Sequence, residues 1–183
     1  MLQLWLPIVL SAVAVFIVSS IIHTLLPWHK GDYAPLPNEE RVLDALRPFA
    51  IPPGDYFAPR PTSRADLGSP EFAERRSKGP VVIMTVMQSG PVKMGGTLVQ
   101  WFVYLLVVST LAGHVACAVL RNGATTHDVF HTTALVAFAA YALALWQIAI
   151  WYRRAWGTTI RSTIDGLIYG MITGALFAWL WPK

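Results

Sequence analysis

Four long apolar runs constrain this chain more than any other feature of its sequence. They cover residues 4–26, 98–120, 129–151 and 160–181. A helix of roughly 20 apolar residues crosses the hydrocarbon core of a bilayer, which is about 30 Å thick. Because 55% of its residues are hydrophobic and only 13% are charged, the chain is too apolar for a soluble domain of its size. The sequence therefore predicts an all-α integral membrane protein with four transmembrane helices.

The fourth run carries small residues at every fourth position. They are Gly166, Gly170, Gly174 and Ala178. Residues four apart share one helical face, and a face without large side chains lets another helix approach closely in lipid. The alanine-rich middle of the third run, residues 137–144, offers a small-residue face to meet it. We expect this glycine row to pack inside one bundle, with a seam between two copies of the chain as the alternative.

Polar side chains lie near one end of every run. Asp165 and Arg161 stand one turn apart near the start of the fourth run, and an ionisable residue inside a span needs a partner. At 1.5 Å per residue, the other runs contribute polar residues within roughly 10 Å of the same boundary. These residues are His23, Gln100, Tyr104 and Gln147. We expect a buried polar layer centred on Asp165; the alternative is a local pair of Asp165 and Arg161 that caps the helix start.

Residues 28–97 form the long hydrophilic connection between the first two runs. They hold ten of the 13 prolines and charges of both signs. A segment this small and this rich in proline does not build an independent core, so we expect a loop of about 70 residues that is not a separate domain. Within it the sequence predicts a helix capped by Asn38, a helix from Ser69 to Gly79, and a short strand or interfacial segment at 81–87.

Two capping boxes predict helix starts. Thr97 with Gln100 precedes the second run, directly after a pair of glycines, and Thr125 with Asp128 precedes the third. In such a box the first side chain accepts from a backbone N–H three residues on, and the second side chain reaches back to the first N–H. We therefore expect the second helix to begin at Thr97 and the third at Thr125.

Basic residues near the ends of the runs predict the orientation. Arg153, Arg154 and Arg161 flank the third connection, and Lys30 and Lys93 flank the first. Because basic residues favour the cytoplasmic side, we expect a cytoplasmic loop 28–97 and two periplasmic termini. The first run has no basic segment before it and no small-residue cleavage signal, so we expect a retained anchor and not a removed signal peptide.

Four residues outside the polar layer are candidate ligands for a metal ion or haem. His127 and His131 lie four apart on one helical face, and His114 and Cys117 lie three apart in the second run. No third metal ligand is evident beside the first pair. A haem bound at His114 would need a second axial histidine, for which only His131 qualifies. We therefore expect ordinary helix-packing or interfacial histidines, and the sequence predicts no metal and no cofactor.

Familiar enzyme motifs do not occur in this sequence. It contains no P-loop, dinucleotide-binding glycine pattern, G-x-S-x-G, H-E-x-x-H or C-x-x-C motif, which favours a role without catalysis. The formal net charge is only +4, and no basic run alternates with aromatic residues, so we expect no nucleic-acid partner. A single cysteine excludes an intramolecular disulfide.

These features favour a scaffold or accessory subunit of a membrane complex. Its expected partners are membrane lipid, through the arginines at the helix ends, and either another protein or further copies of the chain. An oligomeric channel or transporter is the first alternative. A membrane-embedded metal-binding or haem-binding protein is the second.

Three segments resemble a family of small, uncharacterised four-span bacterial inner-membrane proteins. The first precedes the second run and reads QSGPVKMG; the others, in and after the fourth run, read DGLIYGMITG and FAWLWP. The resemblance extends over most of the chain. It implies a bacterial inner (cytoplasmic) membrane and a shared signature that includes Asp165, Gly166, Gly170 and Trp181, and it supplies no catalytic residues.

Overall fold

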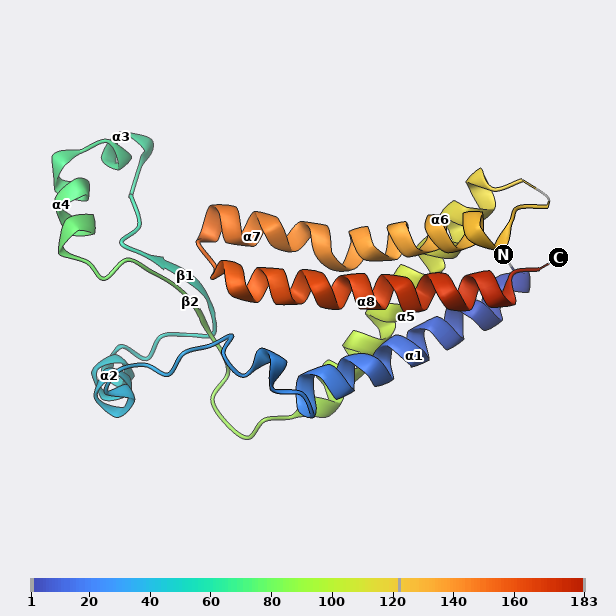
Figure 1. Cartoon of the computed structure of the whole chain (residues 1–183). Helices are drawn as coiled ribbons and strands as arrows, with labels where there is room; N and C mark the ends of the chain where they lie inside the picture. Colours follow the sequence, from blue (N-terminus) through green and yellow to red (C-terminus); the bar gives the residue numbers. More distant parts are fainter. Residues whose placement is uncertain (1, 122, 183) are drawn as a thin grey trace. The chain divides into compact units, whose positions relative to one another are not determined.

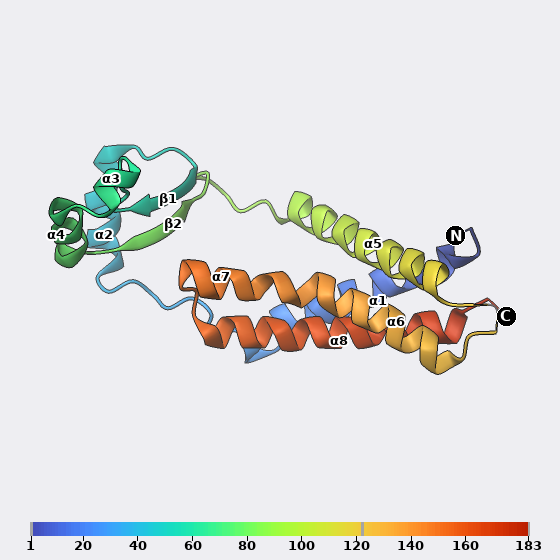
Figure 2. The same ribbon diagram turned by 90° about the horizontal axis from the view of Figure 1, so that it is seen from above.

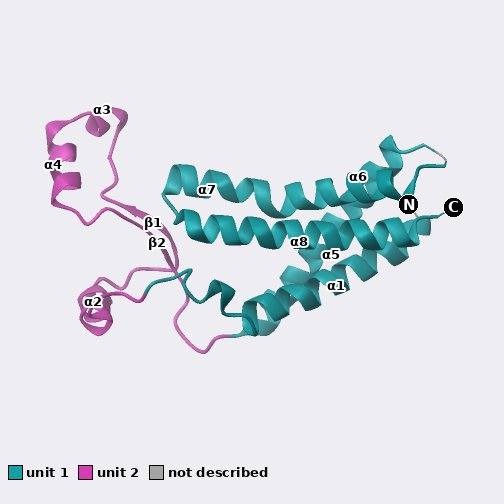
Figure 3. Cartoon of the chain, in the orientation of Figure 1, with its two compact units in different colours: residues 1–34, 93–183 teal, residues 35–92 magenta. Residues whose placement is uncertain are grey.

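The computed structural model describes residues 2–121 and 123–182, and the chain divides into two compact units (Figures 1 and 3). The bundle unit consists of Met1–Ala34 and Lys93–Lys183. The loop unit consists of Pro35–Val92. The bundle unit contains every long apolar helix of the described residues and is therefore the membrane part of the protein.

Four helices among the described residues are long and apolar enough to cross a membrane, which makes the chain a multi-pass membrane protein. They are α1 (Trp5–Thr24), α5 (Met94–Val119), a third helix built from α6 (Thr126–Phe138), the π-helical turn η4 (Ala139–Leu143) and α7 (Ala144–Tyr152), and α8 (Trp156–Leu180). Two short 3-10 helices, η1 (Leu2–Leu4) and η2 (Pro27–His29), flank α1. Because the number of crossings is even, α1 begins and α8 ends at the same end of the bundle (Figure 1).

The two capping boxes have different outcomes. At Thr125 the box forms: the side chain accepts from the N–H of Asp128 (3.2 Å), and the Asp128 carboxylate accepts from the N–H of Thr125 (3.1 Å). At Thr97 the prediction is wrong, because α5 already begins at Met94 and runs through both glycines. Glycine lowers helix propensity but does not prevent a helix. The first turn of α5 therefore forms as a continuation of the long apolar helix that follows it.

The glycine row of α8 faces α6 and η4. A Cβ added at Gly170 would lie 2.9 Å from the carbonyl oxygen of Ala134, and one added at Gly174 would lie 2.7 Å from the Ala134 Cβ. At Gly166 the nearest atom would be the Cβ of Ala142, at 2.8 Å. All three distances are shorter than real Cβ contacts, so α8 and its neighbour lie side by side (Figures 1 and 2) only because these positions have no side chain.

The π-helical turn interrupts the third helix next to Gly166. A π-turn leaves a carbonyl without its usual helical partner, and such turns occur often at functional sites. Here Tyr104 of α5 supplies one bond, because its hydroxyl donates to the Ala140 carbonyl (2.8 Å). The turn also places Tyr141 against Tyr169 of α8, with ring centroids 5.6 Å apart. The interruption thus brings three tyrosines together inside the bundle.

The loop unit has little core of its own. Its elements are α2 (Glu39–Leu46), η3 (Arg47–Phe49), β1 (Gly54–Ala58), α3 (Arg64–Leu67), α4 (Pro70–Lys78) and β2 (Val82–Val86). The strands pair antiparallel, with Gly54 opposite Val86, and the short helices α3 and α4 lie between them in the chain. Of residues 35–92, all of which the structure describes, only Phe72 is buried.

All three elements predicted in this segment are present, but the first helix lacks its predicted side-chain cap. The helix expected from Ser69 to Gly79 is α4, whose first turn is capped by the Ser69 side chain accepting from the Phe72 N–H (3.1 Å). The short strand expected at 81–87 is β2. Asn38 precedes α2 but makes no capping bond through its side chain, because its backbone is left-handed (φ 52°). Asparagine tolerates that conformation better than most residues.

Candidate functional site

A cavity of about 530 Å³ lies among the helices of the bundle unit. Every transmembrane helix contributes to its wall: α1 through Ser19 to Thr24, α5 through Met94 to Tyr104, the third helix through Tyr141 and Leu145, and α8 through Ser162 to Tyr169. Most of the wall is apolar. A cavity of this size with a few polar groups is typical of a binding site for a small molecule.

Three polar atoms of buried residues on the wall of this cavity have no hydrogen-bond partner in the described part of the chain. They are the hydroxyls of Tyr141 and Tyr169 and the Oδ1 oxygen of Asp165. The residues are 9%, 4% and 4% exposed, respectively. Leaving such a group unpaired costs about 1–3 kcal/mol. Three such groups on residues around one cavity therefore lower the stability of the empty bundle.

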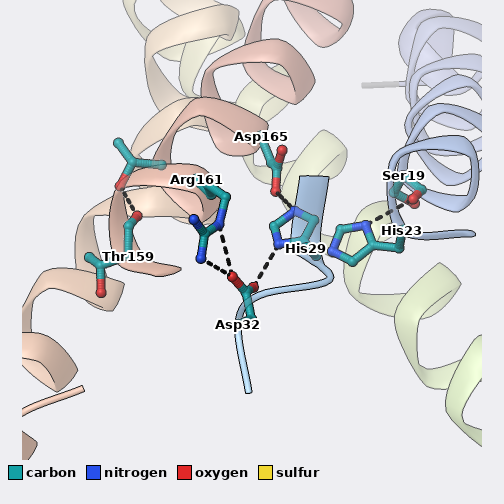
Figure 4. A network of polar contacts seen from close by, with 8 residues as sticks. Ser19, His23, His29, Asp32, Thr159, Arg161 and Asp165 are labelled. Carbon is teal, nitrogen blue, oxygen red and sulfur yellow. Dashed lines mark hydrogen bonds and ion pairs between the residues drawn. The ribbon is translucent and has the colours of Figure 1, made fainter. Parts of the chain in front are cut away.

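A chain of four charged residues, the charged network, runs from α8 to η2 and back to α8 (Figure 4). Arg161 Nε donates to Asp32 Oδ1 (2.9 Å). Asp32 Oδ2 lies 2.7 Å from His29 Nδ1, and His29 Nε2 lies 2.7 Å from Asp165 Oδ2. Asp165 and His29 are 136 positions apart in the sequence, and Pro27 helps to bring them together by starting the short turn η2 directly after α1.

The two contacts of the His29 ring limit where protons can lie in this network. A carboxylate only accepts, and a neutral imidazole has one N–H. Since His29 faces a carboxyl group on each side, either its ring carries both protons or one carboxyl group is protonated. In both cases the three groups together carry one negative charge, which the Arg161 guanidinium balances. The network is therefore neutral as a whole, which suits a position at the boundary of a membrane.

Asp32, like His29, lies outside the transmembrane helices. Burial raises its pKa, but the hydrogen bonds from His29 and Arg161 and their positive charges outweigh burial. The pKa of Asp32 is consequently below its ordinary value. Asp32 is thus held as a carboxylate that accepts from both neighbours.

His23 extends the network toward α1. Its Nδ1 lies 2.9 Å from the Ser19 carbonyl oxygen, and because a carbonyl only accepts, this nitrogen carries the proton. The ring stacks on the ring of His29, with centroids 4.4 Å apart and planes 8° from parallel (Figure 4). The side-chain donor atoms of His23, His29 and Asp165 lie within 4.8 Å of one another. Two imidazoles and a carboxylate at this separation are a donor set that can hold a metal ion.

The structure distributes the residues of the expected polar layer unevenly. His23, Tyr104 and Asp165 all line the cavity, and Arg161 joins them through Asp32. Gln100 and Gln147 are exposed and do not line it. Asp165 bonds to η2, which follows α1 in the chain. Sequence reasoning missed His29 and Asp32; the available signal was a histidine and an aspartate three apart, directly after the Pro27-Trp28 turn.

The four weaker ligand candidates lie elsewhere. His114 and Cys117 are exposed on α5. His127 and His131 are exposed at the start of α6, with ring centroids 4.2 Å apart, and the neighbouring Asp128 is engaged in the Thr125 cap. None of the four lines the cavity.

Among known proteins, no family model, no curated protein and no solved structure matches this chain.

Proposed function

We propose that this protein binds a neutral amphipathic small molecule within its membrane bundle. The observation that carries the proposal is that three residues with an unpartnered buried polar atom, Tyr141, Tyr169 and Asp165, line one otherwise apolar cavity. A ligand that hydrogen-bonds to them would recover free energy that the empty bundle lacks.

The positions of these atoms define the chemistry of the ligand. The Asp165 carboxylate oxygen accepts only, so the ligand must offer a donor, whereas the tyrosine hydroxyls can donate to an acceptor. The charged network is already neutral, so a charged head group would find no counterion in it. Leu98 and Leu145 on the wall suit a hydrocarbon body. The ligand class is therefore a lipid-soluble molecule with a hydroxyl or amide head group.

Filling the cavity tests this proposal. The protein is purified in mild detergent from its own membranes, and bound small molecules are identified by native mass spectrometry. Leu98→Trp places a large ring in the cavity, whereas Leu111→Trp makes the same change at an exposed position of α5 that does not line it. We expect a stoichiometric ligand in the wild type and in Leu111→Trp, and its loss in Leu98→Trp. Equal occupancy in both variants would contradict the proposal.

An accessory-subunit role is a second candidate function, and the loop unit supplies the observation that favours it. Phe57 and Ile83 face each other across the β1–β2 pair, and they are 41% and 50% exposed. Directly opposed residues share a face of the sheet, so this pair is an apolar surface of a kind that a partner protein covers. In native mass spectrometry, Ile83→Lys should remove a partner of fixed stoichiometry, whereas Ser77→Lys on α4 should not.

For its location we propose the bacterial inner membrane, with both termini in the periplasm. The arginines of the third connection support the orientation through the preference of basic residues for the cytoplasm. The resemblance of the segments around Met94 and Asp165 to bacterial inner-membrane proteins supports the choice of membrane.

A further inference from the structure

We infer that His23, His29 and Asp165 bind one divalent transition-metal ion of the Zn²⁺ class. This inference goes beyond the proposed binding of an amphipathic molecule and does not rest on it. The donor atoms of the three residues lie within 4.8 Å of one another. Two imidazole nitrogens and a carboxylate oxygen suit Zn²⁺ and its first-row neighbours, whereas Ca²⁺ and Mg²⁺ prefer oxygen ligands only.

The second nitrogen of each histidine has a hydrogen-bond partner of the kind that metal-binding histidines use. The two rings stack nearly parallel, with centroids 4.4 Å apart, so the exposed His23 ring must turn for both rings to bind one ion. His23 Nδ1 donates to the Ser19 carbonyl (2.9 Å), and His29 Nδ1 lies 2.7 Å from the Asp32 carboxylate. Arg161 in turn holds Asp32. A metal ligand typically donates its other ring N–H to a carboxylate or a backbone carbonyl, which orients the ring and makes the free nitrogen a better ligand. His23 Nε2 is thereby left for the ion, and His29 Nε2 faces Asp165 Oδ2 at 2.7 Å (Figure 4), so the ion would enter between these two atoms.

Asp165 has the capacity that the ion needs. Its Oδ2 lies 2.7 Å from His29 Nε2, and its Oδ1 is buried without a partner in the described residues. An ion that binds between Asp165 and His29 would take the place of the hydrogen bond between them. His23 and Asp165 also line the cavity, so an ion held by them would lie at the cavity wall.

A second histidine pair in the same chain provides a matched control. His127 and His131 are as close to each other as His23 is to His29, with ring centroids 4.2 Å apart. Asp128 lies beside them, with its Oδ1 3.9 Å from His127 Nδ1, but its Oδ2 accepts the N–H and the hydroxyl of Thr125. Among the described residues these three do not form a close three-ligand group as His23, His29 and Asp165 do. Zn²⁺ should therefore prefer the first site, although both pairs consist of two neighbouring imidazoles.

The test is a titration of the full chain, stripped with a chelator and held in detergent micelles, with ZnCl₂. Isothermal calorimetry gives the stoichiometry and the affinity. We expect one ion per chain for the wild type. Since loss of an outer-shell partner alone weakens metal binding about 10–100-fold, His23→Gln, His29→Gln and Asp165→Asn should each weaken it at least about 100-fold. His127→Gln and His131→Gln should leave the affinity unchanged.

Each other outcome overturns the inference. Absence of stoichiometric binding to the wild type does so, and so does an unchanged affinity in His23→Gln or Asp165→Asn. Loss of binding in His127→Gln instead would assign the ion to α6. His23 is exposed, and its hydrogen bond goes to its own helix, so His23→Gln gives a clear result even if the other variants fail to fold. Leu98→Trp should retain Zn²⁺, which separates this result from that for the amphipathic ligand.

Discussion

Asp165 is the residue at which the charged network meets the cavity. Its Oδ2 bonds to His29, while its Oδ1 faces no partner among the described residues. Tyr169 lies one helical turn further along α8, and its hydroxyl is also unpartnered. Each unpaired buried group costs about 1–3 kcal/mol. The buried hydroxyls of Ser11, Ser109 and Thr159 are also unpartnered among the described residues, but these residues do not line the cavity. It is therefore the position of Asp165 and Tyr169 on the cavity wall that supports our proposal of a ligand.

Removing the Tyr169 hydroxyl tests that explanation through stability. In ligand-free protein, Tyr169→Phe should leave the free energy of unfolding unchanged or raise it by up to about 1 kcal/mol, since the lost hydroxyl has no bond. Tyr104→Phe is the matched control: its hydroxyl donates to the Ala140 carbonyl at 2.8 Å, so its loss should cost about 1 kcal/mol. Unfolding in detergent measures both. Equal losses in the two variants would contradict the assignment of an unpartnered hydroxyl.

Asp32 predicts a pH dependence of stability. Its pKa is lowered in the folded state, so its stabilising contribution is complete above the pKa of the unfolded aspartate, about 3.9. The contribution is lost as the pH falls through the lower pKa of the folded protein. At pH 7, Asp32→Asn should lower the free energy of unfolding by about 2 kcal/mol, because hydrogen bonds to charged groups are lost. Thermal unfolding should show a constant difference between the two proteins above about pH 4 and convergence below it. A difference that stays constant down to about pH 2 would contradict this origin.

At the scale of the elements, the apolar runs predict the transmembrane helices well, because length and composition are all that a membrane requires. The predicted start of α5 at Thr97 was wrong. Thr97 and Gln100 match a capping pattern, but the helix already begins three residues earlier, at Met94, so Thr97 lies inside it. The partner of Asp165 was missed for another reason. His29 follows the first run in a connecting turn, and only the folded chain brings it across 136 positions to α8.

The packing of α8 against the third helix gives a prediction at this scale. Gly170→Ala places a Cβ 2.9 Å from the Ala134 carbonyl oxygen, a backbone atom that cannot move alone, so it should cost about 1–3 kcal/mol. Gly96→Ala on α5 makes the same change where no described heavy atom lies within 4 Å. It should be neutral or stabilise by up to about 1 kcal/mol through helix propensity. Melting temperatures of the two variants that shift in the same direction would show that the glycine face is not tightly packed.

For the whole molecule, an even number of crossings places the start of α1 and the end of α8 on the same side of the membrane (Figure 1). The distribution of basic residues predicts which side that is. The third connection is short and carries Arg153 and Arg154, so it counts fully toward a cytoplasmic position, whereas a connection as long as 28–97 counts less. Asp32 and Arg161 lie at the end of the bundle where α8 begins. In the orientation that we propose, the charged network would lie toward the cytoplasm.

Cysteine labelling in intact cells checks this orientation. In a Cys117→Ser background, Thr62→Cys in the loop unit should react with a membrane-impermeant maleimide only after lysis, because the loop faces the cytoplasm in the proposed orientation. A cysteine at Pro182, next to the end of α8, should react in intact cells. If Arg153 and Arg154 set this orientation, changing both to serine should produce a mixed population in which both positions are partly labelled before lysis. Labelling of Thr62→Cys in intact cells with protection of the Pro182 position would reverse the topology and place the charged network on the periplasmic side.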